Sequence, residues 1–580
     1  MKRMVICMCS EDLKHITKCK KYYNESFDVE CWGNVEKELI LLENYDIKTE
    51  KQMIDFINKF NELIGIVEQR DLMNFVKFSF NTLDKEIVSK RVTFNKEIVT
   101  KVETYYFSIK NKIISNPLFD KLPQNYKNYG RIILNDIEIY NKENINLEEE
   151  EDKLKIRYNQ LVSKMTINVD GIEKTIAQLN KELRDVDRKK REIAWKLIRN
   201  KWLEEKETFE ENFQQLRNIR NQMGLNAGFD NYRDYKHRAF CRLDYTPEDL
   251  LTFHNSIEKV IIPIIRDLNQ SKVEKLKLQS IKPWDNEIDI DNITLEPFNN
   301  VEALINANIK LLTKITPDFA EKFKFIDSKG YLDLESRKYK GVGGFCCTVE
   351  QDGSCVISMN SVSSYRDIEQ LIHESGHMVH SFATAKYTIQ KYRMGYMPNE
   401  INELASKTME LLALEHYDEI YSDSENIKQL KKQKLERIIK SFRRYAMIDN
   451  FQHWIYTNPN KSLMEANEYY KFLEDRFDEG VDWTGLDKEK GIGWIEQVHI
   501  FNRPFYFIDY AIAQLGAIAI YKNYKSNKQK TLTQFIDFLN LGYRKSLAEI
   551  YEAAGIQFDF SERYVKQVTD FILEELDNLK

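Results

Sequence analysis

The chain contains few of the residues that interrupt helices. Gly accounts for 20 and Pro for 10 of its 580 residues, whereas charged residues make up 31%. Both residues destabilise the interior of a helix, so their scarcity permits long, unbroken helices. We therefore predict a mainly α-helical protein that is large enough to bury an extensive core.

Cysteine is also scarce, and the eight cysteines do not form a disulfide or metal framework. A disulfide-rich scaffold needs a higher density, and a structural zinc site is typically built on CxxC spacing. Cys7 and Cys9 lack that spacing, and so do Cys346 and Cys347. We expect all eight, including Cys355, to remain thiols.

No apolar segment is long enough to cross a bilayer. The longest run, Tyr510 to Tyr521, is interrupted by Gln514 and is shorter than the ~20 residues that a membrane span requires. Residues 1–15 lack the apolar core and small-residue cleavage site of a secretory signal. The net charge is −6 and no basic block is present, so a nucleic-acid partner is not indicated. We predict a soluble, cytoplasmic protein with no membrane partner.

One short motif points to metal chemistry. Residues 368–383 (IEQLIHESGHMVHSFA) contain HExxH at His373, Glu374 and His377. Apolar residues recur here at helical spacing, and residues four apart lie on one helix face. The two imidazoles can therefore bind a single zinc ion. Glu374 is then suited to act as general base on a metal-activated water.

The segment before this motif has no helical pattern. Residues 341–345 (GVGGF) cannot form a stable helix, and residues 355–359 (CVISM) contain the β-branched run of a strand. Ser364 and Asp367 match a capping box where the motif helix should begin. Two interpretations stay open: a mobile loop with an edge strand that an extended peptide could join, or an ordinary β-hairpin. The candidate substrate contacts are Gly343, Gly344, Phe345 and Ser358.

A third metal ligand should come from a later helix. Residues 399–416 (NEINELASKTMELLALEH) have apolar residues at helical spacing and predict a second amphipathic helix. Glu400, Glu403 and Glu410 share one of its faces, because three and seven residues are close to whole turns. Spacing alone leaves the choice among the three open. On the motif helix, His380 could be a donor behind the site or a packed side chain.

Together these segments resemble a known family. GGF at 343–345, HESGH at 373–377 and ELAS at 403–406 are similar to the zinc oligopeptidases of the thimet oligopeptidase and oligoendopeptidase F group. The resemblance implies that Glu403 is the third zinc ligand. It also implies a mostly helical, two-lobed ellipsoid around a deep central substrate channel, with a small β-sheet near the zinc site.

The resemblance extends to residues 499–517 (HIFNRPFYFIDYAIAQLGA). It implies that His499, Tyr506 and Tyr510 donate hydrogen bonds to the substrate carbonyl as it becomes an oxyanion. Two tyrosines four residues apart share a helix face, and a phenol is a neutral donor suited to this task. A core role remains the alternative for either tyrosine.

We expect an N-terminal helical lobe at 1–200 and a catalytic zinc metallopeptidase region at 201–580. A short strand at 166–169 followed by a turn at 170–171 predicts a small hairpin. Residues 174–224 should then be almost continuously helical.

The expected activity is zinc-dependent hydrolysis of internal bonds in short, unstructured peptides, with one zinc ion per chain. Exopeptidase trimming of dipeptides or single residues on the same fold is an alternative. A catalytically inactive peptide-binding protein is a further alternative, and its function would survive removal of the metal by a chelator.

Overall fold

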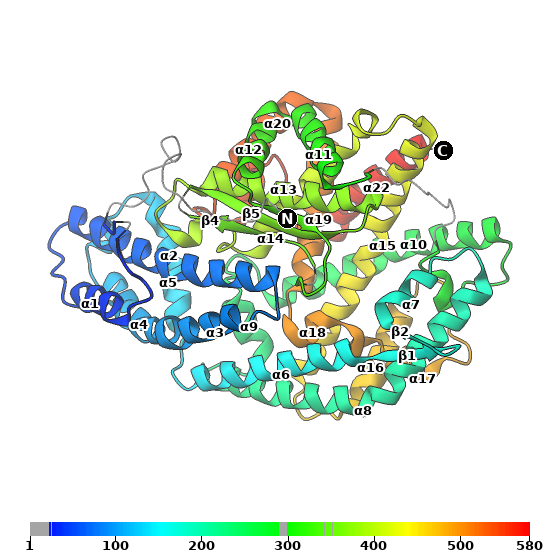
Figure 1. Cartoon of the computed structure of the whole chain (residues 1–580), viewed down its shortest axis with the longest axis horizontal. Helices are drawn as coiled ribbons and strands as arrows, with labels where there is room; N and C mark the ends of the chain where they lie inside the picture. Colours follow the sequence, from blue (N-terminus) through cyan, green and yellow to red (C-terminus); the bar gives the residue numbers. More distant parts are fainter. Residues whose placement is uncertain (1–21, 25, 289–297, 342, 351, 580) are drawn as a thin grey trace. The chain divides into compact units, whose positions relative to one another are not determined.

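The computed structural model describes residues 22–24, 26–288, 298–341, 343–350 and 352–579. Helices dominate it, as the composition predicts, and Figure 1 colours them along the chain. In these described ranges no helix is both long and apolar enough to span a membrane. The predictions for Cys7, Cys9 and residues 1–15 lie outside the described residues. The cysteines among the described residues are thiols rather than half-cystines, as predicted: Cys31, Cys241, Cys346, Cys347 and Cys355.

The chain forms two compact units, each built from three separate segments. Unit 1 comprises Met1–Glu138, Leu295–Ser424 and Gly516–Phe558, and unit 2 comprises Ile139–Thr294, Glu425–Leu515 and Asp559–Lys580. The predicted boundary at residue 200 falls inside helix α8 (Arg188–Asn226), and an N-terminal lobe at 1–200 stays a prediction. That residues 201–580 form the catalytic region stays a prediction, as does a channel between two lobes.

Unit 1 contains most of the helices around the HExxH motif and one of the two small sheets. Its helices are α1 (Trp32–Glu43), α2 (Glu50–Phe80), α3 (Lys85–Phe94), α4 (Thr100–Ile114), α5 (Lys127–Ile139), α11 (Val301–Ile315), α12 (Pro317–Ser328), α13 (Tyr365–Thr384), α14 (Asn399–Leu414), α20 (Lys528–Leu541) and α21 (Leu547–Ala553). Its strands are β3 (Leu332–Glu335), β4 (Phe345–Val349) and β5 (Ser354–Ser361).

Unit 2 is also helical. Its helices are α6 (Asn144–Lys164), α7 (Ile176–Glu182), α8, α9 (Tyr232–Ala239), α10 (Pro247–Leu276), α15 (Ser424–Thr457), α16 (Leu463–Arg476), α17 (Asp487–Gly491), α18 (Val498–Asn502) and α22 (Glu562–Asn578). Its strands are β1 (Thr166–Val169) and β2 (Ile172–Thr175), and α19 (Phe507–Ser526) has residues in both units.

The three-stranded sheet of unit 1 has the order β3-β5-β4. β5 is antiparallel to β4 and parallel to β3. The strand directly before the motif helix is therefore central, which corrects the first of the two interpretations, an edge strand there. β4 and β5 form an antiparallel hairpin, as the second interpretation has it. The sequence pattern could not reveal this, because β3 joins β5 from an earlier part of the chain. The edge strands are β3 and β4, and Phe345 of β4 pairs with Ser358 on β5.

The motif helix α13 begins where the sequence predicts. The Ser364 side chain accepts a hydrogen bond from the backbone N–H of Arg366, and the Asp367 side chain accepts one from the backbone N–H of Ser364. This reciprocal pair satisfies donors that a helix start leaves free. Helices α11, α12, α14 and α20 and the sheet all contact α13, and Figure 1 shows it among them. The helix is thereby buried and fixed on several sides.

The predicted hairpin at 166–175 is confirmed. β1 and β2 pair in antiparallel register, and the turn residues Asp170 and Gly171 have φ of 52° and 84°. Both values lie in the left-handed region that a two-residue hairpin turn of this kind requires.

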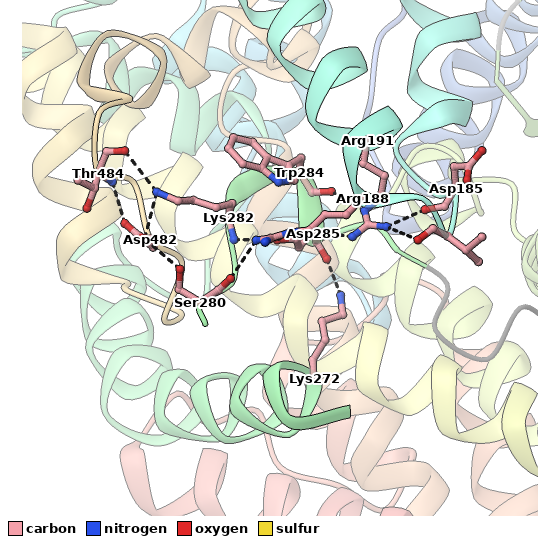
Figure 2. A network of polar contacts seen from close by, with 11 residues as sticks. Asp185, Arg188, Arg191, Lys272, Ser280, Lys282, Trp284, Asp285, Asp482 and Thr484 are labelled. Carbon is pink, nitrogen blue, oxygen red and sulfur yellow. Dashed lines mark hydrogen bonds and ion pairs between the residues drawn. The ribbon is translucent and has the colours of Figure 1, made fainter. Parts of the chain in front are cut away.

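The segment 174–224 is almost continuously helical, as predicted, with one break between the end of α7 at Glu182 and the start of α8 at Arg188. Asp187 caps α8 by accepting a hydrogen bond from the backbone N–H of Lys189 at 2.9 Å. In the network of Figure 2, the buried Asp285 carboxylate pairs with Arg188 at 2.8 Å and with Arg191 at 2.7 Å. These contacts hold the first turn of α8 and separate it from α7.

Candidate functional site

Two helices of unit 1 supply the polar cluster at the motif. His373, Glu374 and His377 lie on α13, and Glu403 lies on α14. The two helices approach closely at Gly376, where a Cβ would lie 2.5 Å from the Cα of Ser406. Only glycine allows this approach, so the residue inside HESGH brings the α14 carboxylate to the imidazoles.

The two imidazoles and the carboxylate converge. His373 Nε2 lies 3.4 Å from Glu403 Oε2, and His377 Nε2 lies 3.9 Å from the same oxygen. One ligand atom from each of the three residues falls within 4.8 Å of the others. Ligands at zinc's ~2.0–2.1 Å bond lengths stand about 3.3 Å apart in a tetrahedron, so the spacing fits a metal ion with little adjustment.

The other face of His373 is held by a second carboxylate. Its Nδ1 lies 2.7 Å from Glu410 Oε1, and Lys407 Nζ donates to the same oxygen at 2.9 Å. Ser406 donates to Glu403 Oε2 at 3.2 Å. Metal-binding histidines commonly use their second nitrogen in this way, which fixes the ring and its tautomer.

The geometry separates carboxylates that the sequence could not distinguish. Glu403 faces the Nε2 atoms of both histidines, whereas Glu410 faces Nδ1 of His373. Glu400 is buried on α14 but does not belong to the group that could hold a metal. The contact between Glu410 and Nδ1 of His373 was not predicted. Only the packing of α14 on α13 shows which nitrogen of the ring this carboxylate faces.

Burial and mutual charge shape the electrostatics of the cluster. Burial raises the pKa of Glu374 to about 7, while the nearby His373 opposes this rise. Burial would also raise the pKa of Glu403, but His377 and His373 hold it below its usual value. Burial lowers the pKa of His377 to about 4, so this imidazole is neutral at pH 7 and able to bind a metal.

His380 does not join the cluster. It is fully buried, neither ring nitrogen has a hydrogen-bond partner among the described residues, and its ring lies 5.5 Å from that of Phe538. Of the two roles that the sequence left open, the structure favours packing.

The glycine-rich loop lies against the cluster. A Cβ at Gly344 would lie 3.2 Å from Glu374 Oε1, so the loop backbone closely approaches the carboxylate. Gly343 has a φ of 92°, and Phe345 begins β4. Ser358 is buried and its strand pairs on both sides, which leaves β4 as the edge next to this loop.

His499, Tyr506 and Tyr510 come together in unit 2. The ring of His499 lies 6.2 Å from that of Tyr506 and 6.3 Å from that of Tyr510, and the tyrosine rings are 5.3 Å apart. Burial, followed by Arg444 and Arg503, lowers the pKa of His499 to about 4. The imidazole is therefore neutral at pH 7 and carries one N–H donor.

Curated proteins with related sequences are oligopeptidases. Oligopeptidase PepF of Bacillus subtilis (strain 168) is 24% identical over 277 residues, which cover 47% of this chain and 40% of that protein. The oligoendopeptidase F homolog of Borreliella burgdorferi is 24% identical over 326 residues, covering 53% of this chain and 52% of that protein. The chain spans about half the length of the curated relatives it matches.

Solved structures share the fold. PZ peptidase A, solved with an inhibitor, superposes with a TM-score of 0.86 at 23% identity, covering 97% of this chain and 99% of that one. Oligoendopeptidase-F from Enterococcus faecium superposes with a TM-score of 0.63 at 15% identity, covering 94% and 97%. Residues 183–569 match peptidase family M3. This range includes His373, Glu374, His377 and Glu403, and also His499, Tyr506 and Tyr510. Because this match extends over more than half of the sequence, the chain belongs to peptidase family M3.

Proposed function

We propose that the chain is a zinc-dependent oligoendopeptidase that hydrolyses internal bonds of short, unstructured peptides. The observation that carries the proposal is the convergence of His373, His377 and Glu403, with Glu374 on the same helix as the histidines. Membership of family M3 and relatives named oligopeptidase or oligoendopeptidase support it. One ion per chain is expected, because the described residues contain one such group.

The donor set suits zinc. Two neutral imidazole nitrogens and one carboxylate oxygen are ordinary zinc ligands, and three protein ligands are typical of catalytic sites that keep a position for water. When bound by His373, His377 and Glu403, zinc would act as a Lewis acid and lower the pKa of a water to about 7. Glu410 would hold the ring of His373 in place.

Glu374 acts as the general base. A base whose pKa lies near the working pH is effective, because about half of it is deprotonated and the deprotonated form accepts a proton readily. Burial raises the pKa of Glu374 to about 7, which meets this condition. The carboxylate accepts the proton of the attacking water and returns it to the leaving amine nitrogen.

His499, Tyr506 and Tyr510 stabilise the oxyanion, a role carried over from the family resemblance. A neutral imidazole and two phenols are donors that can meet a developing negative charge. The close packing of the three rings supports a common task. The peptide backbone would pair with edge strand β4 near Gly343, Gly344 and Phe345.

A peptide blocked at both ends tests the endopeptidase assignment. An N-acetylated, C-amidated decapeptide offers no free terminus, so trimming enzymes that need one cannot cut it. We expect mass spectrometry to find fragments from internal cleavage. Release of only terminal residues or dipeptides from the unblocked peptide, with no cleavage of the blocked one, would instead establish the exopeptidase alternative.

A further inference from the structure

A polar cavity lies in unit 1, and its lining includes none of His373, His377 and Glu403. Its volume is about 250 Å³. The lining includes three aromatic rings, Tyr126, Tyr387 and Tyr392, and two cations, Lys386 and Arg544. No carboxylate occurs among the described residues that line it. A cavity with positive side chains and no acid to neutralise them selects for an anion.

Arg544 is held at the tyrosines rather than by a counter-ion. Its guanidinium carbon lies 5.1 Å from the ring centroid of Tyr387, and its Nη1 donates to the Tyr387 hydroxyl at 3.4 Å. Within the described ranges, no carboxylate lies within ion-pair distance of it. Burial raises the pKa of both Tyr126 and Tyr392, and the Arg544 guanidinium opposes that rise in each. The positive charge of Arg544 therefore lies near the phenol groups of Tyr126, Tyr387 and Tyr392.

The loop that carries Arg544 is closely packed, so its position is built into the fold. Gly542 has a φ of 56°, and a Cβ there would clash with the carbonyl oxygen of Tyr392 and lie 3.2 Å from Cε2 of Tyr387. Asn128, which is buried, donates through Nδ2 to the carbonyl oxygen of Tyr543 at 2.7 Å. Gly542 and Asn128 thus fix the position of the backbone directly before Arg544.

Among the described residues, few partners use the N–H donors of Lys386 and Arg544. Tyr392 donates its hydroxyl proton to the carbonyl oxygen of Asn125 at 2.8 Å, and Tyr387 donates its own to the carbonyl oxygen of Asn540. Lys386 donates to the Asn540 side chain at 2.7 Å, which uses one of its three N–H groups. Among the described residues, no further partner is seen for the remaining N–H groups of the ammonium and guanidinium, so they are open to an acceptor that enters the cavity.

We propose that this cavity binds a small carboxylate that carries one aromatic ring. The planar guanidinium of Arg544 has the geometry to bind a carboxylate through two parallel hydrogen bonds. The rings of Tyr387 and Tyr392 stand edge to face, at 6.2 Å and 89°, and offer apolar walls for a further ring. The volume is below the ~300–1,000 Å³ of sites for drug-sized ligands, so a single-ring ligand fits best.

Binding of 3-phenylpropionate, followed by ligand-observed NMR and titration calorimetry, tests the proposal. For a ligand of this size we expect a Kd on the order of 1–5 mM. The neutral amide, 3-phenylpropionamide, should bind at least tenfold more weakly. Arg544→Gln should weaken binding of the acid by a similar factor. The control Lys545→Gln removes a neighbouring charge that pairs with Glu549 at 2.9 Å outside the cavity, and it should leave binding unchanged.

Two further arms identify the source of the carboxylate and the site. N-acetylphenylalanine carries the same ring and carboxylate as 3-phenylpropionate, together with a peptide bond. If it binds more tightly than 3-phenylpropionate, the natural ligand of the cavity is a peptide C-terminus. If it binds equally or more weakly, the natural ligand is a free organic acid. An acid bound at the metal cluster would be insensitive to Arg544→Gln. If that variant does not fold, Lys386→Gln carries the test, with an expected loss of at least threefold.

Four results would overturn the proposal. They are equal affinity for acid and amide, unchanged binding of the acid to Arg544→Gln, absence of binding by either acid, and Arg544-dependent binding of inorganic phosphate without binding of the carboxylates.

Discussion

Nδ1 of His373 lies 2.7 Å from Oε1 of Glu410, while Nε2 of the same ring points to Glu403. The imidazole of His373 thus lies between two carboxylates of helix α14, and each carboxylate faces a different ring nitrogen. In the proposed enzyme, Glu403 would share the metal with the histidine, and Glu410 would set the orientation and tautomer of the ring.

Glu410→Ala should therefore weaken metal binding without removing a ligand. Loss of such an outer partner typically lowers metal affinity by about 10–100-fold. Competition with a chromophoric chelator measures this affinity. Glu410→Gln keeps an oxygen able to accept from Nδ1 and should lose less. If Glu410→Ala abolishes metal binding as completely as Glu403→Ala does, Glu410 would be a direct ligand.

Gly376→Ala should disturb the fold and the metal site together. The new Cβ would lie 2.5 Å from the Cα of Ser406 and 2.9 Å from the carbonyl oxygen of Ala405, and these backbone atoms cannot rotate away. We expect a loss of about 1–3 kcal/mol in the free energy of unfolding, as is usual for overpacking, measured by urea denaturation. Metal content should also fall, because α14 carries Glu403.

Gly33→Ala is the matched control, since a Cβ at Gly33 meets nothing within 4 Å. It lies in helix α1, where Ala is the better helix former, so stability should be equal or slightly higher. A Gly376→Ala protein as stable and as rich in metal as the control would show that the two helices do not need this close approach.

Tyr510→Phe should reduce kcat while leaving metal content intact. Removal of one donor to a developing oxyanion typically costs about 10²–10³ in kcat. Tyr445→Phe is the control, because its ring stacks on Tyr510 at 6.0 Å but it has no part in the proposed mechanism. Steady-state peptide cleavage checks both variants. Equal, near wild-type rates for the two would place Tyr510 in the core instead.

His380 should make the protein acid-sensitive. Burial, with a smaller contribution from His377, lowers its pKa to about 3 in the folded state. Below the ordinary value of about 6.5 the unfolded chain binds a proton that the folded chain does not, so stability falls as the pH falls. The slope approaches about 1.4 kcal/mol per pH unit.

His380→Leu removes that titration. Urea denaturation at pH 8 and pH 5 should show the variant gaining stability relative to wild type at the lower pH. A stability difference that is the same at both pH values would mean that the His380 pKa is not depressed by folding.

Much of the site could be predicted from local patterns, and the remainder depends on tertiary packing. HExxH on an amphipathic segment placed His373, Glu374 and His377, and the capping box at Ser364 placed the start of their helix. These are relations within a few residues of the chain. The partner of each nitrogen of His373 depends on how α14 packs at Gly376, which the spacing of its carboxylates does not reveal.

The errors have the same origin. One of the two interpretations placed the strand before the motif at a sheet edge, but β3, from an earlier part of the chain, pairs with it. The break within the helical segment after the hairpin was not predicted, because it depends on Asp285, which binds the first turn of α8 from a distant segment, as well as on the cap at Asp187. The cytoplasmic location stays a prediction.

Metal content measured together with peptide cleavage tests the central claim most directly. Wild type should hold about one zinc per chain, lose activity with 1,10-phenanthroline and regain it when zinc is restored. Glu374→Gln should keep its zinc yet turn over about 10²–10⁴ more slowly, as expected for loss of a general base. Glu403→Ala should lose the zinc itself. Wild-type protein that cuts peptides without metal, or Glu374→Gln protein that cuts at the wild-type rate, would contradict the account.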